Sequence, residues 1–133
     1  MSVDGEVVGT IGTGLLVLLG VAEGDDEGQA GRLAEKVARL RVFDGEAGRM
    51  DRSLLDVGGA VLCVSQFTLY GDTRRGLRPS FTEAAEPATA ERLYELFCEH
   101  LARRGVPVET GRFAARMSVG LTNEGPVTIM LET

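Results

Sequence analysis

The stretch Ser65-Gln66-Phe67-Thr68-Leu69-Tyr70 directly follows the apolar run at residues 60–64 and directly precedes a loop rich in Gly, Arg and Pro. An apolar run of this length, bounded by turn residues, predicts a buried strand rather than a helix. The polar side chains of the stretch would then lie at the end of this strand, where it reaches the surface at a pocket. In the alternative interpretation, Ser65, Gln66 and Thr68 are strand residues whose polar atoms bond to neighbouring backbone. Taken by itself, the stretch favours this alternative.

Length and composition indicate a single domain that spans residues 1–133 and has a real hydrophobic core. Apolar residues make up 44% of the chain and charged residues 26%, which excludes a disordered chain. The longest apolar run, residues 15–19, is too short to cross a bilayer, so we expect no membrane partner. The net charge of −6 argues against non-specific coating of nucleic acid. Cys63 and Cys98 show neither a disulfide nor a zinc spacing, so we expect two free thiols in a reducing cytoplasm.

The periodicity of apolar residues predicts an α/β domain built mainly on a sheet, with two main helices. Residues 14–21 are apolar on both faces and predict a central strand. Helical spacing predicts one helix that ends near Leu40 and a second that begins near Pro87 and ends at Gly105. Alternating apolar residues predict strands at 117–121 and 127–131. We expect the sheet to be mostly antiparallel or mixed and to be barrel-like.

The first residues carry a strong hairpin signal, Asp4-Gly5 between apolar residues. An outgoing strand at residues 6–11 is present, but only residues 1–3 remain for its partner. Because strands ordinarily have about 5–6 residues, we expect the first strand to be largely missing. If Asp4-Gly5 is instead a frayed end, the following strand is left with an unpaired edge.

Three arginines, Arg74, Arg75 and Arg78, lie on the glycine-punctuated loop after Tyr70. Guanidinium groups bind phosphates well, so this loop is a candidate for gripping the phosphates of a nucleic acid. The alternative is an ordinary solvated loop.

The sequence offers few groups for acid–base or nucleophilic catalysis. Its only histidine, His100, falls in the second predicted helix, where we expect it to pack or to face solvent. One imidazole leaves almost no way to build a serine or cysteine nucleophile, and no His or Cys ligand set for a metal exists. No glycine fingerprint for a nucleotide is present, so we expect no cofactor. An enzyme of this composition must position and polarise a substrate that supplies the reactive group itself.

Two motifs together resemble the paired signature of the D-aminoacyl-tRNA deacylases, also called D-tyrosyl-tRNA deacylases. One is the stretch 65–70 and the other is Asn123-x-Gly125-Pro126-Val127-Thr128. The match extends in order along nearly the whole chain, and members of the family typically begin about one strand earlier. Its further segments are residues 14–21, 78–81 and 111–113.

The resemblance implies hydrolysis of the ester that joins a D-amino acid, or glycine mischarged on tRNA-Ala, to the terminal adenosine of tRNA. It implies a pocket lined by Ser65, Gln66, Phe67 and Thr68 through their backbone atoms, with Gln66 and Thr68 placed at the chemistry. The 2′-hydroxyl of the tRNA would assist catalysis in place of a protein nucleophile. The alternative function is a non-catalytic RNA- or nucleotide-binding dimer that kept the fold.

The resemblance also implies a homodimer and assigns roles to four residues near the end of the chain. Phe113 and Met117 would hold the terminal adenosine. Gly125 and Pro126, joined by a cis bond, would enter the pocket of the other subunit and exclude L-amino acids. The alternative for this pair is a plain trans turn between two strands.

Overall fold

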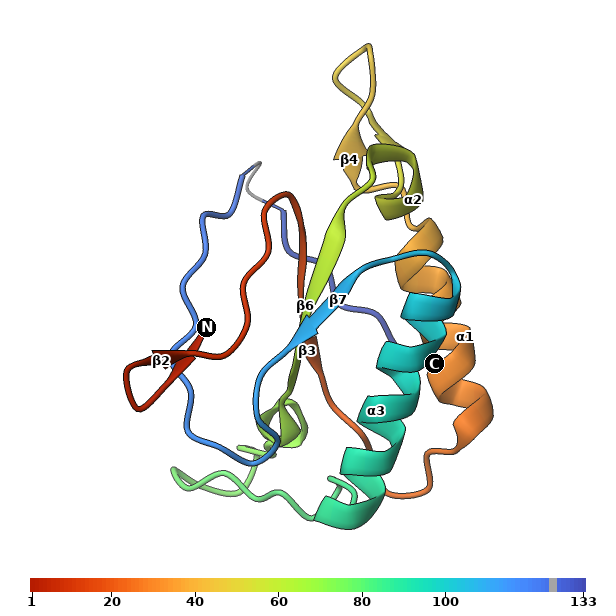
Figure 1. Cartoon of the computed structure of the whole chain (residues 1–133). Helices are drawn as coiled ribbons and strands as arrows, with labels where there is room; N and C mark the ends of the chain where they lie inside the picture. Colours follow the sequence, from red (N-terminus) through yellow and green to blue (C-terminus); the bar gives the residue numbers. More distant parts are fainter. Residues whose placement is uncertain (125–126) are drawn as a thin grey trace.

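The computed structural model describes residues 1–124 and 127–133. Its centre is a three-stranded sheet in the order β3 (Gly14–Leu19), β6 (Ala60–Ser65) and β7 (Val108–Thr110) (Figure 1). The α/β class expected from the sequence is confirmed. None of the described helices is long and apolar enough to cross a membrane.

Both pairings in this sheet are parallel, which corrects the expectation of a mostly antiparallel or mixed sheet. The helix α1 (Glu27–Arg39) connects β3 to β6, and α3 (Pro87–Arg103) connects β6 to β7. A long helical crossover returns the chain to the end from which it started, so the next strand runs in the same direction. Both crossovers advance across the sheet in the same sense, and both helices lie on the same side of it (Figure 1). The described residues contain no closed sheet, so the barrel-like expectation is not confirmed.

Antiparallel pairing occurs in the hairpin at the start of the chain. There, β1 (Ser2–Val3) pairs with β2 (Glu6–Val7), so the Asp4-Gly5 hairpin forms, with a shorter outgoing strand than predicted. Asp4 and Gly5 have φ values of 50° and 80°, the positive values that a tight hairpin turn requires.

The two long helices begin and end where the sequence predicts. Asp26 caps α1: its carboxylate accepts from the Gln29 N–H, and the Gln29 side chain accepts from the Asp26 N–H. Pro87 occupies the first position of α3, and Gly105 follows its end with a φ of 87°.

A short helix, α2 (Leu54–Val57), lies before β6 and was not predicted. Ser53 and Asp56 cap it reciprocally, and this Ser-x-x-Asp spacing is the local signal that could have revealed it. Just before α2, the strands β4 (Phe43–Asp44) and β5 (Met50–Arg52) form a second antiparallel hairpin, which projects at one end of the molecule (Figure 1).

The hydrophobic core lies between the sheet and the two long helices. Tyr94 connects these layers, because its hydroxyl donates to the Cys63 carbonyl at 3.0 Å from α3 to β6. Each large apolar side chain buried here contributes about 1.5–3 kcal/mol. The largest fully buried side chains are Phe97, Leu54, Leu101, Val61, Val106 and Cys63.

The strands predicted at 117–121 and 127–131 do not form. Burial alternates along residues 111–120, as the sequence pattern indicated, but a strand also needs backbone partners along its length. In this region Ser118 forms a single bridge with Ser2, with N···O distances of 2.8 and 2.9 Å. Two apolar side chains that these strands would have placed on the covered face are consequently exposed, Leu121 (61% exposed) and Ile129 (49%). Met130, on the opposite face of the second predicted strand, is 84% exposed.

Candidate functional site

The stretch 65–70 leaves the sheet as soon as it begins. β6 ends at Ser65, Gln66 follows with φ −133° and ψ 82°, and Phe67–Tyr70 forms one turn of 3₁₀ helix. Residues 61–64 are buried, whereas Phe67 and Thr68 are exposed. The interpretation of Gln66 and Thr68 as ordinary strand residues is therefore wrong. The polar residues emerge at the end of a buried strand, as the pocket interpretation requires.

Hydrogen bonds fix this turn at both ends. The Gln66 N–H donates to the Leu19 carbonyl at 2.7 Å, one step beyond the last residue pair of β3 and β6. The Gly71 N–H donates to the Thr68 carbonyl at 2.9 Å and closes the turn. The Gln66 Nε2 donates to the Thr68 Oγ1, so the two side chains assigned to the chemistry contact each other.

The turn packs against the end of β3 at Gly20. A Cβ atom at this position would lie 3.0 Å from the ring of Tyr70 and 3.3 Å from Leu69, so a larger residue would displace the turn. A cavity of about 260 Å³ lies beside Tyr70, between the end of β3, the start of α1 and the last residues of the chain. Burial, together with the charge of Asp25, raises the pKa of Tyr70. The raised pKa keeps this phenol in its neutral form over a wider range of pH.

The one histidine belongs to a different region. His100 lies near the end of α3, with its ring against Gly31 of α1, and its carbonyl accepts from Arg104 Nη1 at 3.0 Å. This agrees with the packing role expected from the sequence. In the part of the chain that the structure describes, no group of three His, Cys, Asp or Glu side chains is placed to hold a metal ion.

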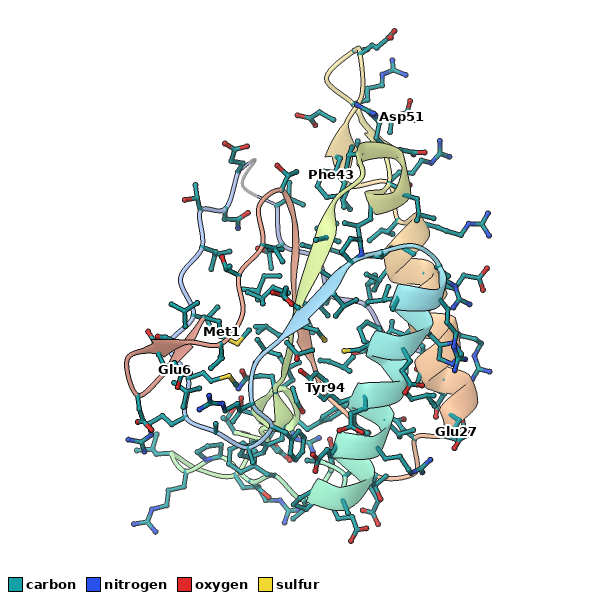
Figure 2. The ribbon with its side chains drawn as sticks, viewed as in Figure 1. Met1, Glu6, Glu27, Phe43, Asp51 and Tyr94 are labelled. Carbon is teal, nitrogen blue, oxygen red and sulfur yellow. The ribbon has the colours of Figure 1, made fainter. Side chains whose placement is uncertain are left out.

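Phe113 and Met117 lie on the extended segment that follows β7. The ring of Phe113 packs against that of Tyr94, with centroids 6.2 Å apart, and Tyr94 points from α3 toward the sheet (Figure 2). The sulfurs of Met117 and Met1 both lie against Gly111. Both Phe113 and Met117 are half-buried, and their contact with adenosine stays a prediction.

The other phenylalanine assigned to the substrate, Phe67, is 55% exposed and belongs to a separate cluster. Its ring meets that of Phe81 at a centroid distance of 5.0 Å and an interplanar angle of 67°. Sequence reasoning missed Phe81 as a neighbour of the turn, because the contact spans a loop and no local pattern encodes it.

The three arginines of the loop differ in whether they form an ion pair. Arg74 is already paired: its Nε and Nη2 donate to the two carboxylate oxygens of Asp72 at 2.9 and 2.8 Å. Its backbone N–H also donates to Asp72 Oδ1 at 3.0 Å. Arg75 and Arg78 are exposed, and neither belongs to an ion pair among the described residues. The guanidinium groups of Arg75 and Arg78 are therefore the ones that remain free to bind a phosphate.

Gly125 and Pro126 lie outside the described residues, so the expected cis bond stays a prediction. Asn123, which precedes this pair, forms hydrogen bonds with two residues that follow it. Its Oδ1 accepts from the Val127 N–H, and its Nδ2 donates to Thr128 Oγ1, each at 3.3 Å.

The sequence model of a protein family described as D-Tyr-tRNA(Tyr) deacylase matches residues 1–132. The chain belongs to this family. Similar members are the D-aminoacyl-tRNA deacylases of Ruegeria pomeroyi, 61% identical over 132 residues, and of Symbiobacterium thermophilum, 59% identical over 133 residues. These alignments cover 99% and 100% of this chain and 91% and 88% of the relatives. The resemblance inferred from the two motifs is confirmed, and it places the chain in a family of ester hydrolases.

Two solved structures share the fold of this deacylase family member. One, a c-Myc DNA Unwinding Element Binding Protein, has a TM-score of 0.91 and 38% identity, over 99% of this chain and 90% of that one. The other, a probable eukaryotic D-amino acid tRNA deacylase, has a TM-score of 0.66 over 83% of this chain and 78% of that one. Its identity of 16% supports likeness of fold alone.

We expect the Asp72 carboxyl to titrate at a pKa of about 2, because the Arg74 side chain and N–H stabilise its charged form. A carboxyl whose pKa is lowered on folding stabilises the folded loop above its unfolded pKa of about 3.9. That contribution should be lost as the pH falls toward 2. Carbon-13 NMR of the Asp72 carboxyl measures the midpoint directly.

In Arg74→Gln the midpoint should rise toward the ordinary value of 3.8, while the N–H of residue 74 still holds it somewhat lower. Arg75→Gln is the matched control and should leave the midpoint where it is. An ordinary midpoint in the parent protein would show that the pair does not form.

Proposed function

We propose that this chain, as one domain spanning residues 1–133, hydrolyses the ester bond of D-aminoacyl-tRNA in the cytoplasm. The observation that carries the proposal is the Ser65–Thr68 motif at the surfacing end of a buried strand, in a member of a deacylase family. Glycine mischarged on tRNA-Ala is the second substrate that we propose. Release of a radiolabelled D-amino acid from its tRNA, compared with the L-amino acid, tests the activity.

The turn offers hydrogen-bonding groups but no strong base, which favours assistance by the substrate. The first hydrogen-bonded N–H inside the turn is that of Leu69, which donates to the Gln66 carbonyl at 3.3 Å. A 3₁₀ turn leaves the preceding N–H groups, those of Phe67 and Thr68, without internal partners, so they are suited to hold the ester carbonyl oxygen. Water then attacks the acyl carbon and the bond to the ribose oxygen breaks. The neighbouring 2′-hydroxyl of the adenosine assists transfer of the water's proton to that oxygen, and the free amino acid leaves. Gln66 and Thr68 position the substrate.

We also propose that the working form is a homodimer in which Gly125 and Pro126 reach the partner's turn and exclude L-amino acids. Apolar side chains on both sides of this pair support the proposal, because Leu121 and Met130 are 61% and 84% exposed in the single chain. Exposed apolar groups of this size are typical of surfaces that a partner covers. A rigid backbone at the pocket would discriminate by clash, independently of any side-chain rotamer.

Phe113 and Met117 are proposed to contact the terminal adenosine. Aromatic rings and methionine sulfurs both suit the flat face of a base. The packing of Phe113 on Tyr94 would hold the ring in one orientation before the tRNA binds.

A second candidate function, nucleic-acid binding without turnover, is favoured by one observation. The solved structure with a TM-score of 0.91 and 38% identity is named as a DNA unwinding element binding protein. The deacylation assay separates the two functions, because a binding module would retain tRNA without releasing the amino acid.

Thr68→Ala should keep a substantial part of the hydrolytic rate, within about 10-fold of the parent, because no base activates this hydroxyl. Substituting hydrogen for the 2′-hydroxyl of the terminal adenosine should abolish turnover by the parent protein. Single-turnover release of the D-amino acid measures both effects. A loss in Thr68→Ala as large as that for removal of a covalent nucleophile would refute the mechanism.

The double substitution Arg75→Glu with Arg78→Glu should weaken tRNA binding and flatten its salt dependence. Each lost phosphate contact lowers the slope of log K against log salt by about 0.7–0.9. Filter binding at several salt concentrations measures this slope. The control, Arg39→Glu with Arg49→Glu, makes the same change of charge on α1 and on the β4–β5 hairpin and should keep the parent slope. Equal slopes in the two double variants would show that the loop is ordinary solvated surface that does not contact the phosphates.

Pro126→Ala should allow measurable hydrolysis of L-aminoacyl-tRNA, because alanine does not favour the backbone geometry that we propose for the chiral filter. The rate ratio of D- to L-aminoacyl-tRNA is the quantity to compare. Pro87→Ala, at the first position of α3, is a matched control that should keep the parent ratio. If Pro126→Ala spares L-aminoacyl-tRNA as completely as the parent does, this residue is not part of the chiral filter.

A further inference from the structure

The segment Arg78-Pro79-Ser80-Phe81 matches the family, yet apart from the charge of Arg78 the proposed reaction gives it no role. In the structure it returns from the loop to the 3₁₀ turn. Phe81 meets the ring of Phe67 edge-on, with centroids 5.0 Å apart and an interplanar angle of 67°. Edge-to-face contact is one of the two arrangements that a pair of aromatic rings prefers. Phe81 therefore contacts the residue with which the turn begins.

Phe81 also contacts the other end of the turn. A Cβ atom at Gly71 would lie 3.2 Å from Phe81 Cε1, 3.7 Å from Pro79 Cβ and 3.0 Å from the Thr68 carbonyl oxygen. Gly71 is the residue whose N–H closes the turn on the Thr68 carbonyl. The absence of a side chain at Gly71 lets the ring of Phe81 approach this hydrogen bond closely.

The backbone around Phe81 is itself anchored. On one side, Asp72 and Ser80 exchange two backbone hydrogen bonds of 2.7 and 2.9 Å, which close the loop at its base. On the other side, the Ala85 N–H donates to the Val21 carbonyl at 2.9 Å, just beyond the end of β3. Phe81 is thus held between two fixed points while its ring rests on the turn.

We propose that Phe81 is a positioning residue for hydrolysis, acting with Gly71 to hold the backbone of Phe67 and Thr68 in its reactive geometry. This inference rests on the proposed function of that turn. Phe67 is 55% exposed, so its own burial does little to fix it, and the ring of Phe81 supplies the missing constraint. Catalysis by positioned backbone groups is sensitive to such a constraint, since a displacement of about 1 Å can cost about 100-fold in rate.

Three variants separate positioning from general stability. Phe81→Leu removes the ring, and Phe81→Tyr keeps it. Phe43→Leu makes the same loss as the first variant at a half-buried phenylalanine that packs on the main core from β4. The readouts are the single-turnover rate constant on saturating D-aminoacyl-tRNA, the affinity for uncharged tRNA, the melting temperature and the amide hydrogen-exchange rates of Leu69 and Gly71. The N–H groups of these two residues make the hydrogen bonds of the turn, to the carbonyls of Gln66 and Thr68.

Phe81→Leu should lower the rate constant by about 10-fold or more, while the affinity for tRNA changes by no more than about twofold. The two amides should exchange faster in Phe81→Leu and at nearly the parent rate in Phe81→Tyr, which should recover most of the rate of hydrolysis. Phe43→Leu should lower the melting temperature and leave the rate constant unchanged well below it.

Unchanged amide exchange in Phe81→Leu would overturn the positioning role, whatever the activity. Faster exchange with an unchanged rate of hydrolysis would instead show that the turn is remote from the reaction, which refutes the proposed site and the positioning role with it. A loss of rate in Phe43→Leu equal to that in Phe81→Leu would reduce the effect to general stability and would also overturn the proposal.

Discussion

The parallel pairing of β3 with β6 is the constraint on which the candidate site depends. The register runs from Gly14 opposite Ala60 to Leu19 opposite Ser65, and the Gln66 N–H adds one further bond to the Leu19 carbonyl. Beyond that bond no strand among the described residues pairs with the chain, which turns away at once. The end of the register thereby determines which residues form the exposed turn, and a slip of one residue would bury a different set.

Most elements of the fold were predictable because their signals are local. The helices follow from periodicity and caps such as Asp26 and Pro87, and the first hairpin follows from Asp4-Gly5. Strand direction was not predictable in the same way, nor was the lack of strands among the described residues after 116. Both depend on which distant backbone lies alongside, and alternating apolar residues carry no information about that partner.

The candidate site likewise has features that local sequence predicts and features that depend on distant residues. Its position at the end of β6 followed from the apolar run and the motif, and the resemblance supplied the roles. The 3₁₀ conformation did not follow, because it depends on the distant Leu19 carbonyl and on the space left by Gly20. The pairing of Arg74 with Asp72 was within reach, since a carboxylate two residues before an arginine is a local signal.

The turn and its loop contain no strongly perturbed catalytic group. Their side chains and backbone groups can act only through the positions in which hydrogen bonds and ion pairs hold them. Asp72 neutralises Arg74, so that pair holds the loop in shape while Arg75 and Arg78 keep their charges free. Gln66 and Thr68 bond to each other, and under the proposed function the neighbouring backbone N–H groups would be the donors for the ester. Backbone donors cannot be tuned by a pKa, so their only adjustable property is position. The residues that fix the turn therefore matter to such a site as much as those that would touch the substrate.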